Sequence, residues 1–123
     1  MTAKKRILVV EDEKPLAKIL QLKLQDAGFE VEVVSDGEAA ITHITTKNSI
    51  DLIILDLMLP KVDGFGVLEA LKKNNVHIPI IVTTILSQEE DRKKVMSYGV
   101  KEYLVKTRIS LSDIVTHVRK YLP

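Results

Sequence analysis

The sequence contains no cysteine and no tryptophan, and aromatic residues make up only 4% of its 123 positions. Without cysteine the chain cannot form disulfides, a thiolate metal site or a cysteine nucleophile. A charge excess of one sign is also missing, because 18 Lys and Arg residues face 17 Asp and Glu residues, for a net charge of +1. That balance argues against direct binding of nucleic acid, which usually requires a strong basic excess.

Long hydrophobic runs are absent as well. The N-terminal segment, MTAKKRILVVEDE, turns acidic after one short apolar run, which is too short for a signal peptide or a membrane span. The 5 glycines and 4 prolines are scattered, with no linker, repeat or low-complexity stretch. We therefore expect a single domain over residues 1–123, located in the cytoplasm and without a membrane partner.

Two kinds of apolar segment alternate along the chain. Short runs rich in β-branched residues predict strands at 7–10, 31–34, 52–55, 78–82 and 103–105. Segments with helical periodicity predict helices at 15–27, at 37–46, after Asp63-Gly64, near 87–97 and from Ser110 onwards. Five such βα units predict a doubly wound parallel sheet with helices on both faces.

The first predicted helix carries the clearest signals. Pro15 suits the first helical position, and Gly28 suits a left-handed stop after the last turn. We expect its buried stripe to consist of Leu16, Ile19, Leu20, Leu24 and Ala27. At the other end of the chain, Ser110 and Asp113 form a pattern typical of a capping box.

In this architecture ligands bind beyond the carboxyl ends of the strands, and candidate site residues follow every predicted strand except the second, which ends in Val34 and Ser35 and contributes no charge. The candidate site residues are Glu11, Asp12 and Glu13 after the first strand, Asp56 after the third, Thr83 and Thr84 at the fourth, and Lys106 after the fifth. Clustered carboxylates repel one another unless a cation lies among them, and oxygen ligands of this kind favour Mg²⁺. Asp56 ends the apolar run Ile53-Ile54-Leu55, which makes it the best candidate nucleophile for forming an aspartyl phosphate.

At these residues the sequence resembles a response-regulator receiver domain of two-component signalling. The resemblance lies in ILVVEDE, DLIILDLMLPKVDG, PIIVTT and GVKEYLVK, which occur in that order over nearly the whole chain. It implies a flavodoxin-like (βα)5 fold with strand order 2-1-3-4-5. It also implies a phosphoacceptor switch that takes a phosphoryl group from the phosphohistidine of a histidine kinase or phosphotransfer protein.

The resemblance further assigns roles to individual residues. Asp56 would be the phosphoacceptor. Asp12, Asp56 and the backbone carbonyl of Met58 would hold Mg²⁺, with Glu11 acting partly through water. Lys106 would contact the phosphoryl oxygens, and Thr84 and Tyr103 would move inward on phosphorylation and change the face formed by the fourth helix, fifth strand and fifth helix.

Partner contacts are also implied. In this family the first helix packs against the kinase, so Pro15, Ile19 and Leu22 are candidate contacts, although a single exposed leucine needs no function. We expect a monomer, with a phosphorylation-dependent dimer left open. The downstream target is unknown, no separate effector fits within 123 residues, and the chain could be a stand-alone protein or a receiver from a longer regulator.

Two positions depart from the family pattern. The residue after the switch hydroxyl is usually small and is Ile85 here, which either narrows access to Asp56 or simply extends an apolar strand edge. The proline that usually follows the lysine is replaced by Thr107. A cis bond before a residue other than proline costs about 3–4 kcal/mol, so we expect a trans Lys106–Thr107 bond.

The resemblance also implies that the residues two positions after the acceptor and two after the switch hydroxyl tune the lifetime of the phosphoryl group, and both are apolar here. Met58 and Leu86, each two residues after a site residue, cannot position an attacking water, so we predict slow self-dephosphorylation and no other enzymatic activity. The departures keep a second interpretation open, a receiver-like interaction module that works without phosphorylation. An enzyme or nucleotide-binding protein on the same fold is disfavoured because a G-x-x-x-x-G-K-[ST] motif is absent.

Overall fold

The computed structural model describes residues 3–46 and 49–123. Its strands are β1 (Arg6–Val10), β2 (Glu30–Val34), β3 (Leu52–Leu55), β4 (Ile80–Thr84) and β5 (Glu102–Val105). Its helices are α1 (Lys14–Asp26), α2 (Gly37–Thr45), α3 (Gly64–Lys73), α4 (Glu89–Met96) and α5 (Leu111–Tyr121), with a short 3-10 turn at Lys106–Arg108. Strands and helices alternate as the sequence predicts.

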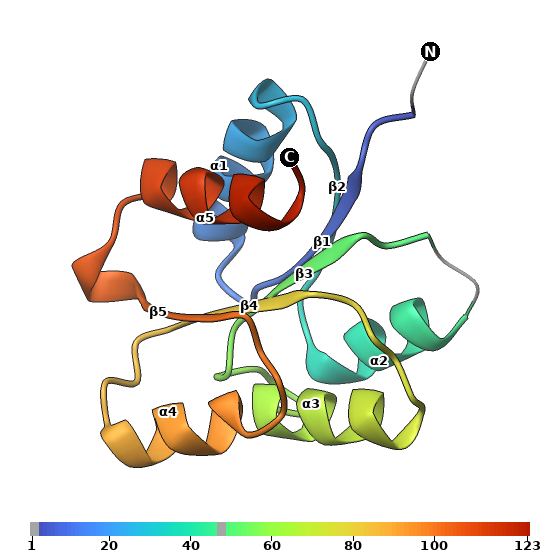
Figure 1. Cartoon of the computed structure of the whole chain (residues 1–123), viewed down its shortest axis with the longest axis vertical. Coiled ribbons are helices and arrows are strands. Elements are labelled where there is room, and N and C mark those ends of the chain that lie inside the picture. Colours follow the sequence, from blue (N-terminus) through green and yellow to red (C-terminus); the bar gives the residue numbers. More distant parts are fainter. Residues whose placement is uncertain (1–2, 47–48) are drawn as a thin grey trace.

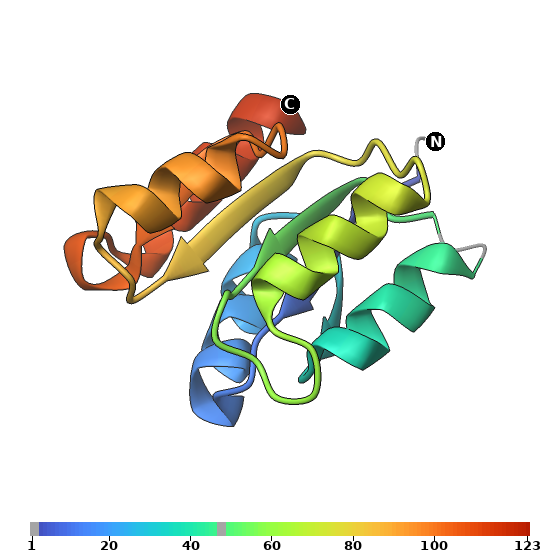
Figure 2. The same ribbon diagram turned by 90° about the horizontal axis from the view of Figure 1, so that it is seen from below.

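All five strands are parallel and lie in the order β2-β1-β3-β4-β5, which confirms the predicted topology. Helices α1 and α5 cover one face of the sheet, and α2, α3 and α4 cover the other (Figure 1). Figure 2 shows the same layers from below, with α2, α3 and α4 on the near side. Because the strands are parallel, their carboxyl ends lie at one edge of the sheet. The strand order changes direction between β1 and β3, which is where ligands bind in such sheets.

The two faces of the sheet have separate cores because side chains alternate along each strand. On β3, Leu52 and Ile54 pack towards α1 and α5, while Ile53 and Leu55 pack towards α2, α3 and α4. All four of these side chains are buried, as expected for a strand in the middle of a parallel sheet. The central strand is therefore a rigid support for the residue that follows it.

Polar side chains fix where several helices begin. Asp36 accepts a hydrogen bond from the Ala39 N–H at the start of α2. The predicted capping box of α5 is confirmed, since Ser110 and Asp113 each accept a hydrogen bond from the other's backbone N–H. Gly28 has a φ of +101°, which confirms the left-handed stop after α1.

Three predicted details are wrong. Strand β4 covers Ile80–Thr84 rather than 78–82, because Pro79 has no N–H for the ladder and the polar β-branched Thr83 and Thr84 continue the strand. Helix α4 begins at Glu89, two residues later than expected. Ile19 is 48% exposed, because α1 turns Ala17 towards the core instead.

Candidate functional site

Asp56 lies directly beyond the carboxyl end of β3 and is only 5% exposed. Its backbone N–H donates to the Val10 carbonyl at 3.0 Å, so it continues the pairing of the two central strands. Its Oδ1 accepts a hydrogen bond from the Met58 N–H at 3.2 Å. Backbone contacts thus hold a carboxylate at the centre of the sheet edge.

Gly64 closes the loop that follows Asp56, and the sequence did not reveal this role. A Cβ at position 64 would lie 2.6 Å from the Asp56 carbonyl oxygen, which is too close for any other residue. The Gly64 N–H also donates to the Leu57 carbonyl at 2.8 Å. The sequence pattern marks Asp63-Gly64 only as a helix start, whereas the structure shows that the glycine is also needed for backbone packing under the site.

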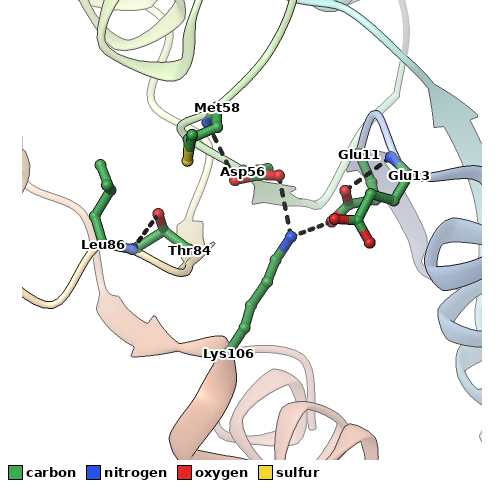
Figure 3. Close-up of polar contacts among 7 residues, drawn as sticks. All are labelled: Glu11, Glu13, Asp56, Met58, Thr84, Leu86 and Lys106. Carbon is green, nitrogen blue, oxygen red and sulfur yellow. Dashed lines mark hydrogen bonds and ion pairs between the residues drawn. The ribbon is translucent and has the colours of Figure 1, made fainter.

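Lys106 joins two acidic side chains across this edge (Figure 3). Its Nζ lies 3.0 Å from Asp56 Oδ2 and 2.7 Å from Glu11 Oε1. The other Glu11 oxygen accepts a hydrogen bond from the Glu13 N–H at 3.1 Å. Glu11 is 3% exposed, so this is a largely buried ion-pair network.

Burial and ion pairing shift the pKa values of Glu11 and Lys106 in opposite directions. Burial raises the pKa of Glu11, and the Lys106 and Glu13 hydrogen bonds offset that increase only partly. Burial lowers the pKa of Lys106, but the hydrogen bonds and negative charges of Glu11 and Asp56 outweigh it, so that pKa is raised overall. Lys106 therefore stays a cation at neutral pH.

A cavity of about 200 Å³ opens beside Asp56. It is lined by Asp12, Glu13, Asp56, Met58, Ile85 and Lys106. Met58 and Ile85 are 51% and 55% exposed, so two large apolar side chains border this cavity. Ile85 lies just beyond β4, where it lines the approach to Asp56.

The predicted magnesium ligands can be compared with this geometry. Asp12, Asp56 and Met58 share the cavity, and two carboxylates plus a carbonyl with room for water suit a small hard cation. Over residues 3–46 and 49–123, no three His, Cys, Asp or Glu side chains form a metal-binding group. Both Glu11 oxygens are engaged, with Lys106 and with the Glu13 N–H. Both Asp56 oxygens are engaged as well, with the Met58 N–H and with Lys106, so the types of donor fit Mg²⁺ but the metal itself stays a prediction.

The two candidate switch residues meet at the backbone of Leu86. The Thr84 side chain is fully buried, and its hydroxyl accepts a hydrogen bond from the Leu86 N–H at 3.1 Å (Figure 3). The Tyr103 hydroxyl donates to the Leu86 carbonyl at 2.9 Å. The Leu86 peptide groups therefore link the end of β4 to β5.

The remaining predicted residues lie away from the cavity or beside it. Pro15, Ile19 and Leu22 are all exposed on α1, and none of them lines the cavity beside Asp56. In the parts of the chain that the structure describes there is no cis peptide bond, so the Lys106–Thr107 bond is trans as predicted. Within those same parts, no helix is both long and apolar enough to cross a lipid bilayer.

Comparison with known proteins gives one consistent family. Residues 7–119 match the response regulator receiver domain family. The chain is 39% identical over 119 residues to the probable transcriptional regulator ycf27 of Cyanophora paradoxa, covering 97% of this chain and 48% of that protein. It is 38% identical over 102 residues to the alkaline phosphatase synthesis transcriptional regulatory protein PhoP of Bacillus subtilis, covering 83% and 42%.

Solved structures agree with this assignment. The Francisella response regulator 1452 receiver domain superposes with a TM-score of 0.89 at 30% identity, covering 96% of each chain. The phosphorylated cyanobacterial phytochrome response regulator RcpA superposes with a TM-score of 0.84 at 31% identity, covering 98% and 95%. The chain belongs to the response regulator receiver domain family of two-component signalling. It spans about half, or less, of the length of the curated relatives described above.

Proposed function

We propose that the chain is a phosphoacceptor switch in which Asp56 accepts a phosphoryl group from the phosphohistidine of a histidine kinase or phosphotransfer protein. The observation that carries the proposal is the position of Asp56, a buried carboxylate that lines an open cavity and lies 3.0 Å from the Lys106 ammonium. An Asp56 oxygen attacks phosphorus, the P–N bond of the donor breaks, and the imidazole leaves as the neutral ring after taking up a proton.

Charge around the transferring group supports this reaction. Phosphoryl transfer places negative charge on the equatorial oxygens, and a cation already held beside Asp56 stabilises it without reorganisation. Lys106 is such a cation, and it stays charged because its pKa is raised. Asp12, Asp56 and the Met58 carbonyl would hold Mg²⁺, whose charge would stabilise the phosphoryl oxygens further.

The switch step would begin at Thr84. If its hydroxyl turned towards a phosphorylated Asp56, the Leu86 N–H would lose the acceptor that it has now. The Tyr103 hydroxyl is bonded to the carbonyl of the same residue, so its environment would change with it. Helix α4 buries only Val95 fully, which makes the α4–β5–α5 face easy to shift between two states.

The exposed side of α1 supports a protein donor. Ile19 and Leu22 are 48% and 52% exposed on a helix that begins right after the acidic residues that follow β1. A partner helix packed against these side chains would lie next to the Asp56 cavity. For the output, the naming of the curated relatives as transcriptional regulators favours a role in gene control.

Intact-mass analysis after incubation with a small phosphodonor and Mg²⁺ tests the proposal. Wild type should gain the mass of one phosphoryl group, and Asp56→Asn should gain none. Asp26→Asn, a matched change at an exposed carboxylate, should behave as wild type. The absence of any gain in wild type, with small donors and with kinases, would contradict the proposal.

One observation favours the alternative of an interaction module without phosphorylation. Ile85 is 55% exposed and lines the cavity beside Asp56, where so large a side chain would reduce access to the carboxylate. Under that alternative, Asp56→Asn would leave partner binding unchanged, because the surface rather than the modification would be recognised.

A further inference from the structure

A second cavity lies on the α1 and α5 side of the sheet, separate from the one beside Asp56. Its volume is about 140 Å³. Its walls come from α1, from the segment before α5 and from α5 itself, which lie on the same face of the sheet (Figure 1). The apolar wall residues are Leu16, Leu20, Ile109, Leu111 and Ile114. Leu20 and Ile114 are buried, while the other three are half-buried, so these hydrophobic surfaces remain partly open to water.

Four polar residues line the same cavity, and one of them, Ser110, already accepts a hydrogen bond from the Asp113 N–H through its hydroxyl. Glu11 and Lys106 are paired with each other at 2.7 Å, so their charges largely cancel there. The fourth is Thr83, which is 3% exposed. Within residues 3–46 and 49–123, the Thr83 hydroxyl has no hydrogen bond to another residue, and it is not among the fully buried side-chain atoms without a partner, so it is accessible from the cavity. This hydroxyl is a donor and acceptor available to an occupant of the cavity.

Size and chemistry together define what fits. An apolar cavity of about 150 Å³ is enough to hold benzene. Small-molecule sites typically combine apolar walls with a few polar groups that fix orientation. A charged ligand would have to disturb the Glu11–Lys106 pair, whereas an uncharged one with a single hydroxyl would leave it intact and satisfy Thr83.

We propose that the cavity between α1 and α5 binds a small uncharged aromatic molecule bearing one hydroxyl group, the phenol class, with its ring between Leu20 and Ile114 and its hydroxyl bonded to Thr83. A ligand of this size should bind with a Kd on the order of 1 mM. Phenol and toluene have the same number of heavy atoms, so comparing them isolates the hydroxyl.

Lys106 borders both cavities, which gives the site a regulatory consequence. If the proposed function holds, an occupant beside Lys106 should change the rate at which Asp56 is phosphorylated. Binding itself does not depend on phosphoryl chemistry. A protein that binds phenol but cannot be phosphorylated would therefore refute the proposed function alone.

The test is an amide NMR titration of the full chain with phenol and with toluene, without any phosphodonor. Phenol should give saturable shifts centred on Thr83, Leu20 and Ile114. Thr83→Val removes the hydroxyl but keeps the shape, so it should weaken phenol binding roughly two- to tenfold and leave toluene binding unchanged or tighter. Thr42→Val, at an exposed threonine on α2, should affect neither ligand.

A second variant tests whether the ligand occupies this cavity without relying on the Thr83 hydrogen bond. Ile109→Trp adds bulk at the half-buried edge of the cavity and should abolish the binding of both ligands, with melting curves showing that the variant still folds. Shifts that do not saturate, equal phenol affinity in wild type and Thr83→Val, or tighter binding of benzoate than of phenol would each overturn the proposal.

Discussion

Removing the Lys106 ammonium should destabilise the fold in a way that depends on pH. In the Lys106→Met variant, Glu11 and Asp56 stay buried without the cation that now lies 2.7 and 3.0 Å from them. At an effective dielectric constant of about 20, each contact corresponds to an attraction of about 5–6 kcal/mol, most of which is offset by desolvation. Loss of one partner from such a network typically costs about 3–5 kcal/mol. Because Lys106 is 15% exposed, we expect about 3 kcal/mol at pH 7.

The sign of the pH dependence follows from Glu11. Its folded-state pKa lies above the ordinary value of 4.5, mainly because it is buried. A carboxyl with a raised pKa contributes stability that is fully present below its unfolded pKa and is lost as pH rises through the folded pKa. Without Lys106 the pKa of Glu11 rises further. The loss in free energy of unfolding of Lys106→Met relative to wild type should therefore grow between pH 4.5 and pH 7.

Urea unfolding followed by circular dichroism, at pH 5 and at pH 7, measures this difference. Lys101→Met, at an exposed lysine, should change the free energy of unfolding by less than about 0.5 kcal/mol at either pH. Adding Glu11→Gln to Lys106→Met should restore part of the loss, because it removes one uncompensated charge. An equal loss in the free energy of unfolding of Lys106→Met at both pH values, or no loss at pH 7, would refute the reasoning.

Four further changes test other parts of the account. Ile85→Ala should speed phosphorylation by small donors without changing the melting temperature, which a donor-dependent rate and a melting curve would check. Leu22→Glu should slow transfer from the cognate kinase but not from a small donor, and an equal loss with both would indicate a folding defect instead. Met58→Asn should accelerate the decay of labelled phosphoprotein, and a decay as slow as in wild type would count against the role of this apolar position. Ser110→Ala should lower stability by about 1 kcal/mol through loss of the capping box, as urea unfolding would show.

Much of the fold follows from local patterns. Continuous apolar runs such as 52–55 predict central strands because a parallel sheet buries both faces. The helix signals at Gly28 and Ser110 are equally local, and both are confirmed. Contacts between elements far apart in the sequence cannot be predicted from local patterns. The helical periodicity therefore predicts a buried Ile19, which is wrong. The rotation of α1 about its axis is decided by its contacts with the sheet and α5, and these favour Ala17.

The candidate site was predicted in part. Strand ends indicated that Asp56, Glu11 and Lys106 gather at one edge, and the structure brings them within hydrogen-bonding distance. The sequence did not indicate that Lys106 is already paired with Glu11, because that depends on how the turn at Lys106–Arg108 directs the side chain. It places Thr83 at the end of the fourth strand but assigns it no role, because that role depends on the cavity beneath α1 and α5.

The central claim is that Asp56 carries the phosphoryl group, and reductive trapping tests it most directly. Borohydride reduces an acyl phosphate to an alcohol with release of phosphate, so a phosphorylated aspartate becomes homoserine. Peptide mapping of wild type treated with phosphodonor, Mg²⁺ and borohydride should find homoserine at position 56 and at no other aspartate. Homoserine at Asp12, or an unmodified Asp56 in protein that has gained phosphoryl mass, would contradict the account.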